Sequence, residues 1–440
     1  MVPHLTTALT GPLLSLEKQV LGAMPEIEHW FRQQWQEHAA PFYASVDLRN
    51  SGFKLAPVDT NLFPAGFNNL REDFHPLAVH ALMSAVEKLC PETEKLLLIP
   101  ENHTRNLFYL QNIAALRSLL TRAGVKVRIG SLIPDLTGPT PFDLPNGDSL
   151  VLEPVQRDGK RLRLPDFDPC AVLLNNDLSG GVPAILQGLE QQVIPPTWAG
   201  WSTRRKSRHF LAYDRVSEDF ARLLGIDPWF VNPLFSTCGR IDFSAREGED
   251  CLAANVEELL GQIRDKYRQY EIPHDPFLIV KADAGTYGMG IMTVKSPDDV
   301  RNLNRKQRNK MAVVKEGLEV SEVLIQEGVY TFEQVEQGVA EPVVYMIDHF
   351  VVGGFYRVHT GRGQDENLNA PGMHFVPLAF EGNCQAPDAD CSETHPNRFY
   401  TYGVVARLAL LAASLELEDM AAEFGQHDAS QLPQPAATKV

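Results

Sequence analysis

Lys281 ends an apolar strand pattern, and three glycines, Gly285, Gly288 and Gly290, follow it before a second apolar pattern begins. Glycines let backbone N–H groups approach phosphate oxygens closely, and the lysine supplies the fixed positive charge that an anion needs. No Walker G-K-[ST] follows, and a strand pattern stands where the dinucleotide fingerprint requires a helix. The run therefore predicts a hairpin flap over phosphates. The alternative is an ordinary hairpin with a glycine-rich tip.

Two later strand patterns also end in polar residues. The run EVLIQEGV ends in Gln326, Glu327 and Val329, a hinge that can present backbone groups to a purine and a carboxylate to ribose hydroxyls. The run VVYMIDHFVVGGFYRVH predicts a hairpin whose outgoing strand ends in Arg357. Lys281 and Arg357 converging from different strands would suit transfer of a γ-phosphoryl group, in which the protein mainly positions groups and neutralises charge. The alternatives are an edge strand and a surface arginine.

The loop GQDENLNAPG places Glu366, Asn367 and Asn369 beside Asp365. Oxygen ligands of this kind suit a Mg²⁺ ion that bridges ATP phosphates. A solvated loop is the alternative.

Residues 41–75 combine short apolar pieces with many hydrogen-bonding side chains, which favours a strand-and-loop region that can clamp a small zwitterion. The candidate substrate residues in it are Arg49, Asn50, Lys54, Asp59, Asn61 and Asn68. An arginine can bind a carboxylate bidentately, and Asp59 could take an ammonium group. The alternative is that these residues cap turns. The run ENHTRN, at 101–106, is a second candidate.

Helical and strand patterns alternate between residues 95 and 200, which predicts a parallel sheet with ligands at its carboxyl edge. We therefore expect an α/β (α+β) protein, in which a Rossmann-like open sheet precedes a two-lobed ATP clamp. The predicted parts are a helical and loop region with a candidate substrate site at 1–94, the open sheet at 95–200, the clamp at 201–425 and a disordered tail at 426–440.

The charge and composition narrow the function class. The chain has 440 residues and a net charge of −16, which argues against nucleic-acid binding. No apolar run reaches the ~20 residues that a membrane helix needs. The six cysteines lack zinc-ligand spacing, and the N-terminus lacks the pattern of a secretion signal, so we expect a cytoplasmic protein with reduced thiols.

The order of these parts resembles the ATP-grasp superfamily, in which two α+β lobes clamp ATP. The run STRRKSRHF is similar to the place where the glutathione synthetase branch carries its first phosphate-contacting lysine, which implies that role for Lys206. The resemblance likewise implies that Lys281 is the second such lysine, with Gln326 and Glu327 at the hinge.

Three longer runs narrow the resemblance: SVDLRNSGFKLAPVDTNLFPAGFNNL, KADAGTYGMGIMTVKS and DENLNAPGMHFVPLAF. They look like a small bacterial family of glutamate–cysteine ligases, over roughly residues 20–410. The implied reaction joins L-glutamate to L-cysteine with ATP and Mg²⁺, giving γ-glutamylcysteine, ADP and phosphate. The alternatives are another ATP-grasp ligase with different substrates and an ATP-binding protein without turnover.

One departure concerns the metal. ATP-grasp enzymes usually hold magnesium with an Asp on one strand and an E-x-N on the next. The late E-x-N here is Glu381–Gly382–Asn383, and no Asp precedes it at the usual spacing. The metal candidates are therefore Asp348, the loop residues Glu366, Asn367 and Asn369, and the pair Glu381 and Asn383.

Overall fold

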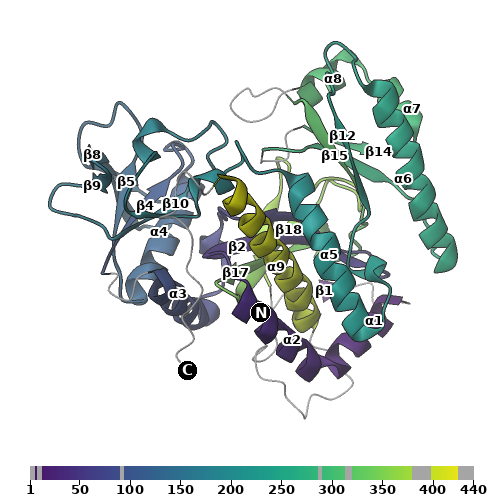
Figure 1. Ribbon diagram of the computed structural model, residues 1–440, viewed down its shortest axis with the longest axis horizontal. Coiled ribbons are helices and arrows are strands. Elements are labelled where there is room, and N and C mark those ends of the chain that lie inside the picture. Colours follow the sequence, from purple (N-terminus) through teal and green to yellow (C-terminus); the bar gives the residue numbers. More distant parts are fainter. Residues whose placement is uncertain are drawn as a thin grey trace.

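The computed structural model describes residues 5–6, 12–89, 94–285, 290–312, 320–378 and 398–424. Within this part of the chain the strands form three main sheets and one small hairpin. The three sheets define what we call the open-sheet domain, the small lobe and the large lobe, which are seen at the left, the upper right and the centre of Figure 1.

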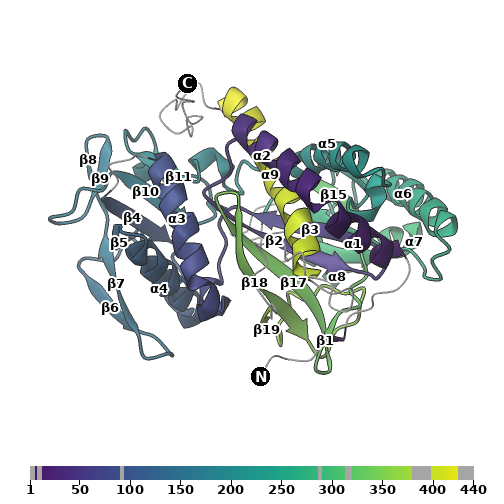
Figure 2. The same cartoon turned by 90° about the horizontal axis from the view of Figure 1, so that it is seen from below.

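The open-sheet domain has the strand order β11-β10-β4-β5-β7-β6, in which only the β6–β7 pair is antiparallel. Leu96, Leu97, Leu98 and Ile99 of β4 are fully buried, as expected for a parallel strand that is covered on both faces. Helices α3 and α4 cover one face (Figure 2). The bounds are α3 His75–Leu89, β4 Lys95–Pro100, α4 Leu107–Arg122, β5 Lys126–Ser131, β6 Thr140–Asp143, β7 Ser149–Pro154, β10 Ala171–Asn175 and β11 Gln192–Ile194.

Two details of this domain differ from the sequence expectation. One helical pattern of the alternation expected between residues 95 and 200 forms only a 3-10 turn at Ala184–Leu186, because Pro183 precedes it and Gly188, at φ 60°, follows it closely. The chain also forms a second hairpin, β8 Gln156–Asp158 with β9 Arg161–Arg163, whose strands are too short to give an apolar pattern.

The small lobe is a four-stranded sheet of order β12-β15-β13-β14, in which every pair is antiparallel. Helix α6 packs on one face through an apolar stripe that includes Leu252, Val256 and Ile263. The sequence pattern missed β12, because its residues FSTCG show no clear alternation. The bounds are β12 Phe235–Gly239, α6 Glu249–Gln269, β13 Leu278–Ala282, β14 Ile291–Val294, α7 Pro297–Arg301, α8 Arg305–Ala312 and β15 Glu322–Glu327.

The large lobe is a seven-stranded sheet that joins both ends of the described chain. Strand β17 pairs with β18 along one side and with β2 and β16 along the other, and β3 extends the sheet beyond β2. The bounds are β1 Leu5–Thr6, β2 Tyr43–Asn50, β3 Leu55–Asn61, β16 Gln334–Val335, β17 Gly338–Ile347, β18 Phe350–His359 and β19 His374–Pro377.

Helix α9, Arg398–Phe424, packs against β2, β3 and α5, and is the long yellow helix of Figures 1 and 2. Its residues 404–406 and 408–413 are almost fully buried, which explains an apolar pattern that continues around the helix. The other helices of this layer are α1 Pro12–Gly22, α2 Met24–Glu37 and α5 Lys206–Leu224. No described helix is long and apolar enough to cross a membrane. The topology confirms the expected fold class, while the domain boundaries stay a prediction.

Candidate active site

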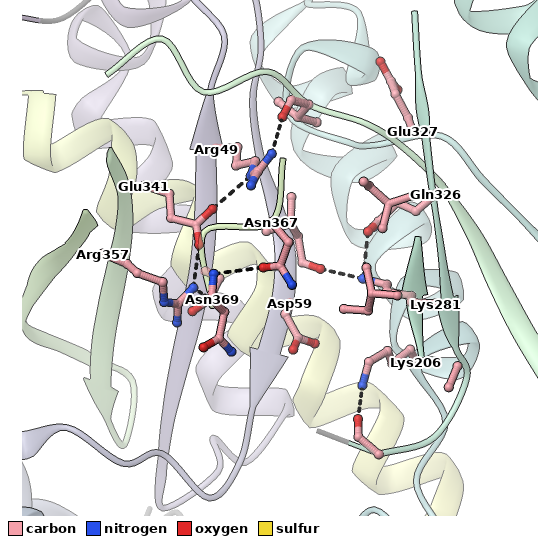
Figure 3. A pocket seen from close by; sticks show the side chains of 17 residues that line it. Arg49, Asp59, Lys206, Lys281, Gln326, Glu327, Glu341, Arg357, Asn367 and Asn369 are labelled. Atoms are coloured by element: carbon pink, nitrogen blue, oxygen red, sulfur yellow. Dashed lines mark hydrogen bonds and ion pairs between the residues drawn. The ribbon is translucent and has the colours of Figure 1, made fainter. Parts of the chain in front are cut away.

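A cavity of about 120 Å³ lies where the small-lobe sheet faces the large-lobe sheet (Figure 3). Its lining brings together eleven of the residues singled out in the sequence. These are Arg49, Asp59, Lys206, Lys281, Gly285, Gln326, Glu327, Val329, Arg357, Asn367 and Asn369. The cavity therefore collects the predicted phosphate, substrate and loop residues from segments that are far apart in the chain.

Lys281 projects from β13 into the cavity and is 5% exposed. Its Nζ donates to the carbonyl oxygen of Val58 at 2.7 Å and to Oε1 of Gln326 at 2.8 Å. Burial lowers the pKa of Lys281 to about 8, because the ammonium form loses contact with water. Its two hydrogen-bond partners are neutral, so its charge remains available to an anion.

Lys206 is the first residue of α5, and its Nζ donates to the carbonyl oxygen of Gly285 at 2.6 Å. The ammonium group also lies 3.7 Å from the ring centre of Trp201, and burial lowers its pKa. Asp283 fixes this helix end, because its carboxylate accepts from the backbone N–H and the hydroxyl of Ser207. Lys206, Lys281 and Gln326 together form what we call the lysine wall.

The alternation of side chains along β15 separates Gln326 from Glu327. Gln326 lies opposite Ile279 in the β13–β15 ladder, so it shares the cavity face of the sheet with Ile279 and Lys281. Its Nε2 is buried and has no hydrogen-bond partner among the described residues. Glu327 points to the other face, where its carboxylate accepts from Lys54 and Trp229. The expectation that Glu327 offers its carboxylate to ribose is therefore not met by this arrangement.

Asp47 and Asp59 lie directly opposite each other in the β2–β3 ladder, so both carboxylates point to one face. Like charges in such a cross-strand pair are destabilising. Burial raises the pKa of Asp47; Arg357 opposes that rise, while Glu341 and Asp59 add to it. Burial works against the charge of Asp59 too, but Lys206 and Lys281 lower its pKa. The pair is suited to holding a cation.

Glu341 on β17 connects two arginines. Its Oε2 accepts from Nε of Arg49 at 2.9 Å, and its Oε1 accepts from Nη1 of Arg357 at 2.5 Å. Burial works against the charge of Glu341, but the two guanidinium groups lower its pKa. Arg357 also donates to Asp47 at 2.8 Å, while its Nε is buried without a partner among the described residues. Asp47, Asp59 and Glu341, with Arg49 and Arg357, form what we call the carboxylate wall.

The loop after β18 contributes Asn367 and Asn369 to the cavity. The side-chain oxygen of Asn367 accepts from the backbone N–H of Asn369 at 2.9 Å, which fixes the turn between them. Glu366 takes a different direction. Its carboxylate accepts from Arg362 at 2.9 Å and from the N–H of Gly363 at 2.7 Å, and only its carbonyl oxygen reaches Arg49.

Several predicted residues lie outside the cavity. The side chain of Asn50 bonds to Glu333 and Tyr402, whereas that of Asn61 closes a local turn with Phe63. Asn68 is exposed. Lys54 is buried against Glu327. Gly290 supports β13 through its carbonyl oxygen, which accepts from Ala282.

The metal candidate Asp348 lies away from the cavity. It stands in the turn between β17 and β18 and accepts from Ser84 and Lys88. Seven residues separate it from Glu341 along one strand, which is roughly 20 Å in extended backbone. It therefore cannot share a metal with the cavity residues. The candidates Gly288, Glu381 and Asn383 lie outside the described residues.

The sequence analysis missed two carboxylates of the cavity, Asp47 and Glu341, together with its apolar lining of Val58, Ile279, Ala282 and Ile291. A signal for Asp47 was present, since alternation through the run YASVDLRN places it two residues before Arg49. Glu341 gave no signal, because its importance depends on the β17–β18 register that sets it opposite Arg357.

Comparison with known proteins decides the family. The family model of glutamate–cysteine ligase matches residues 17–417. The chain belongs to the glutamate–cysteine ligase family. This membership confirms the resemblance seen in the sequence and makes the chain an ATP-dependent ligase. No curated protein matches it.

Solved structures provide further comparisons. A crystal structure from Methylobacillus flagellatus KT, provisionally named a γ-glutamylcysteine synthetase, is 69% identical with a TM-score of 0.89; the match covers 96% of this chain and 99% of that one. D-alanyl-alanine synthetase A from Vibrio cholerae is 11% identical with a TM-score of 0.34, covering 72% and 81%. A glutathione synthetase-like effector from Globodera pallida is 11% identical with a TM-score of 0.34, covering 79% and 78%.

Proposed function

We propose that the cavity joins the γ-carboxylate of L-glutamate to the amino group of L-cysteine through an acyl phosphate, converting ATP to ADP and phosphate. This is the first step of glutathione synthesis. The observation that carries the proposal is the meeting of two unlike walls across one cavity. Lysines with neutral partners lie on one side, and carboxylates with arginines lie on the other (Figure 3).

The lysine wall binds the triphosphate in this proposal. Lys206 and Lys281 neutralise phosphate oxygens, and the unpartnered Nε2 of Gln326 donates to an acceptor of the nucleotide. The apolar side chains of Ile279 and Ile291 face the same cavity and suit a purine ring.

In this proposal, Asp47 and Asp59 of the carboxylate wall would hold Mg²⁺. Magnesium is commonly bound by one or two carboxylates together with substrate phosphates, and this cross-strand pair offers such a donor set. Asn367 and Asn369 add amide oxygens nearby. The bound ion would offset phosphate charge as the γ-phosphoryl group is transferred.

Arg357 orients the reacting carboxylate. Its Nη1 is held by Asp47 and Glu341, which leaves the buried Nε as a donor toward a carboxylate or phosphoryl oxygen. The acyl phosphate must be kept from water until the amine attacks it, and the burial of Lys206, Lys281 and Glu341 supports such a dry site.

The test is ADP release by the purified protein with Mg-ATP in a grid of the twenty amino acids, singly and in pairs. We expect turnover that needs glutamate and cysteine together, with γ-glutamylcysteine identified by mass spectrometry. Turnover with another pair would overturn the substrate assignment. ATP binding without ADP release across the grid would overturn the proposal of catalysis.

A further inference from the structure

The tip of the β2–β3 hairpin leaves the large lobe and enters the small lobe. Phe53 lies within the apolar core of the small lobe, 6.2 Å from the ring of Trp229 and 5.4 Å from that of Tyr267. The next residue, Lys54, is 0% exposed although it carries a charge. A lysine is rarely buried in this way unless it is paired.

The partner of Lys54 is the hinge residue Glu327. Nζ of Lys54 lies 2.6 Å from Oε2 of Glu327 and 4.3 Å from the ring centre of Trp229. The same carboxylate accepts from the indole Nε1 of Trp229 at 3.1 Å and from the backbone N–H of Leu234 at 2.9 Å. These donors satisfy the carboxylate on the face of β15 that points away from the cavity.

The backbone beside Glu327 is fixed as well. The backbone N–H of Glu327 donates to the carbonyl oxygen of Leu234 at 2.7 Å. The N–H of Gly328 donates to the carbonyl oxygen of Phe277 at 2.8 Å. A Cβ at Gly328 would come within 2.1 Å of the Phe277 ring, so the chain passes closely over that side chain. The adjacent residue, Gln326, therefore has little freedom in where it places its amide.

We propose that Lys54 is a positioning residue for the nucleotide: by holding Glu327 on the far face of β15, it fixes the Gln326 amide and, through it, Lys281 in the cavity. The Glu327 carboxylate is then a structural acceptor for a large-lobe side chain and does not bind the ribose. The inference rests on the proposed function only in taking ATP as the ligand. It also means that the large lobe sets the geometry of the lysine wall, although none of the lysine-wall residues belongs to its sheet.

The experiment measures ATP affinity by titration calorimetry with Mg-ATP, and KM and kcat by ADP release, in the full-length protein. Lys54→Met should weaken ATP binding at least tenfold and raise KM for ATP, while kcat at saturating ATP stays within threefold. Lys54→Arg should recover most of the affinity. The matched control is Lys88→Met. It removes the lysine that pairs with another buried carboxylate, Asp348, at a place far from the cavity. It should lower Tm and leave ATP affinity within twofold.

If Lys54→Met does not fold, Lys54→Met combined with Glu327→Gln removes both charges and keeps an acceptor for Trp229; it should still bind ATP at least fivefold more weakly. Wild-type ATP affinity in a folded Lys54→Met protein, or an equal loss in Lys88→Met, would overturn the inference. Failure of the wild-type protein to bind ATP would instead count against the proposed function.

Discussion

The cationic side chains of the two walls have different hydrogen-bond partners. On the lysine wall, Lys206 and Lys281 bond to a backbone carbonyl oxygen or a side-chain amide. On the carboxylate wall, Arg49 and Arg357 bond to Glu341, and Arg357 bonds also to Asp47. A cation with neutral partners keeps its field for a ligand, whereas a cation paired with carboxylates is largely compensated.

This difference separates the two tasks of the site. On the lysine wall, the hydrogen bonds described for Lys206 and Lys281 go to neutral groups and carboxylates act on them only at longer range. This wall therefore suits a triphosphate, whose charge it can neutralise. The carboxylate wall is close to balanced, with three carboxylates and two guanidinium groups, so it suits a cation and a zwitterionic amino acid. Removing a charge from the lysine wall should therefore weaken the binding of ATP. Removing a charge from the carboxylate wall should weaken the binding of the cation or of the amino acid.

The largest expected effect comes from the lysine wall. Lys281→Ala removes a preorganised charge and should lower kcat/KM for ATP by about 10²–10³-fold, in line with the loss of one electrostatic donor in other active sites. The circular dichroism spectrum should not change. The control Lys160→Ala removes an exposed lysine of the β8–β9 hairpin and should leave the kinetics alone. Unchanged turnover in Lys281→Ala would contradict the assignment of the triphosphate to the lysine wall.

The carboxylate wall is tested by Asp59→Asn. The loss of one carboxylate should weaken Mn²⁺ binding in the presence of ATP by about 10–100-fold, since a neutral amide is a poorer ligand for a hard cation. Electron paramagnetic resonance of free Mn²⁺ measures this without turnover. Asp348→Asn serves as the matched control, because that carboxylate lies far from the cavity. Equal Mn²⁺ affinity in Asp59→Asn and the wild type would remove the metal assignment.

A pH dependence sharpens the comparison. The pKa of Lys281 is about 8, below its ordinary 10.5, so the charged form prevails below pH 8 and is lost as the pH rises through that value. KM for ATP should therefore rise above pH 8, by up to about tenfold per pH unit. Lys281→Arg should flatten the profile, because a guanidinium group stays charged. A flat wild-type profile between pH 7 and 9.5 would contradict the prediction.

The smallest effect is expected at the rim, where the exposed Lys295 of the small lobe bonds to Asp365 of the large-lobe loop at 2.6 Å. Exposed ion pairs contribute little, so Lys295→Ala should change the free energy of unfolding by less than about 1 kcal/mol. KM for ATP should stay within twofold. A larger kinetic effect would mean that the rim pair helps to join the walls.

The sequence predicted the lysine wall better than the carboxylate wall, and the reason is local. Lys281 and its glycines are adjacent in the chain, so spacing alone indicates their chemistry. Asp47 lies near Glu341 only because β2 pairs with β17, and Arg357 lies opposite Glu341 only because β18 pairs with the other side of β17. Glu327 lines the cavity, but the two-residue period of β15 turns its carboxylate to the face opposite Lys281.

The fold was predictable where elements repeat in order along the chain, as in the alternating strands and helices from Lys95 to Ser131. It was not predictable that residues 43–61 complete a sheet with residues 338–377, since single-sequence patterns do not contain strand partners. The same limit explains why the metal candidate Asp348 lies away from the cavity. The metal candidates were sought close in sequence to Arg357, whereas the carboxylates nearest to it are Glu341 and Asp47.

The pairing of β2 with β17 also constrains how the molecule is made. Strand β2 can pair with β3 as soon as both are made, but the ribosome must add roughly 300 residues after β2 before β17 exists, so the β2–β17 contact is among the most non-local of the chain. The open-sheet domain, whose strands are close in sequence, is complete long before that. Until then, apolar residues of the first segment such as Val46 and Leu48 lack the partners that bury them in the folded protein, and apolar surface exposed in this way makes a nascent chain prone to aggregation.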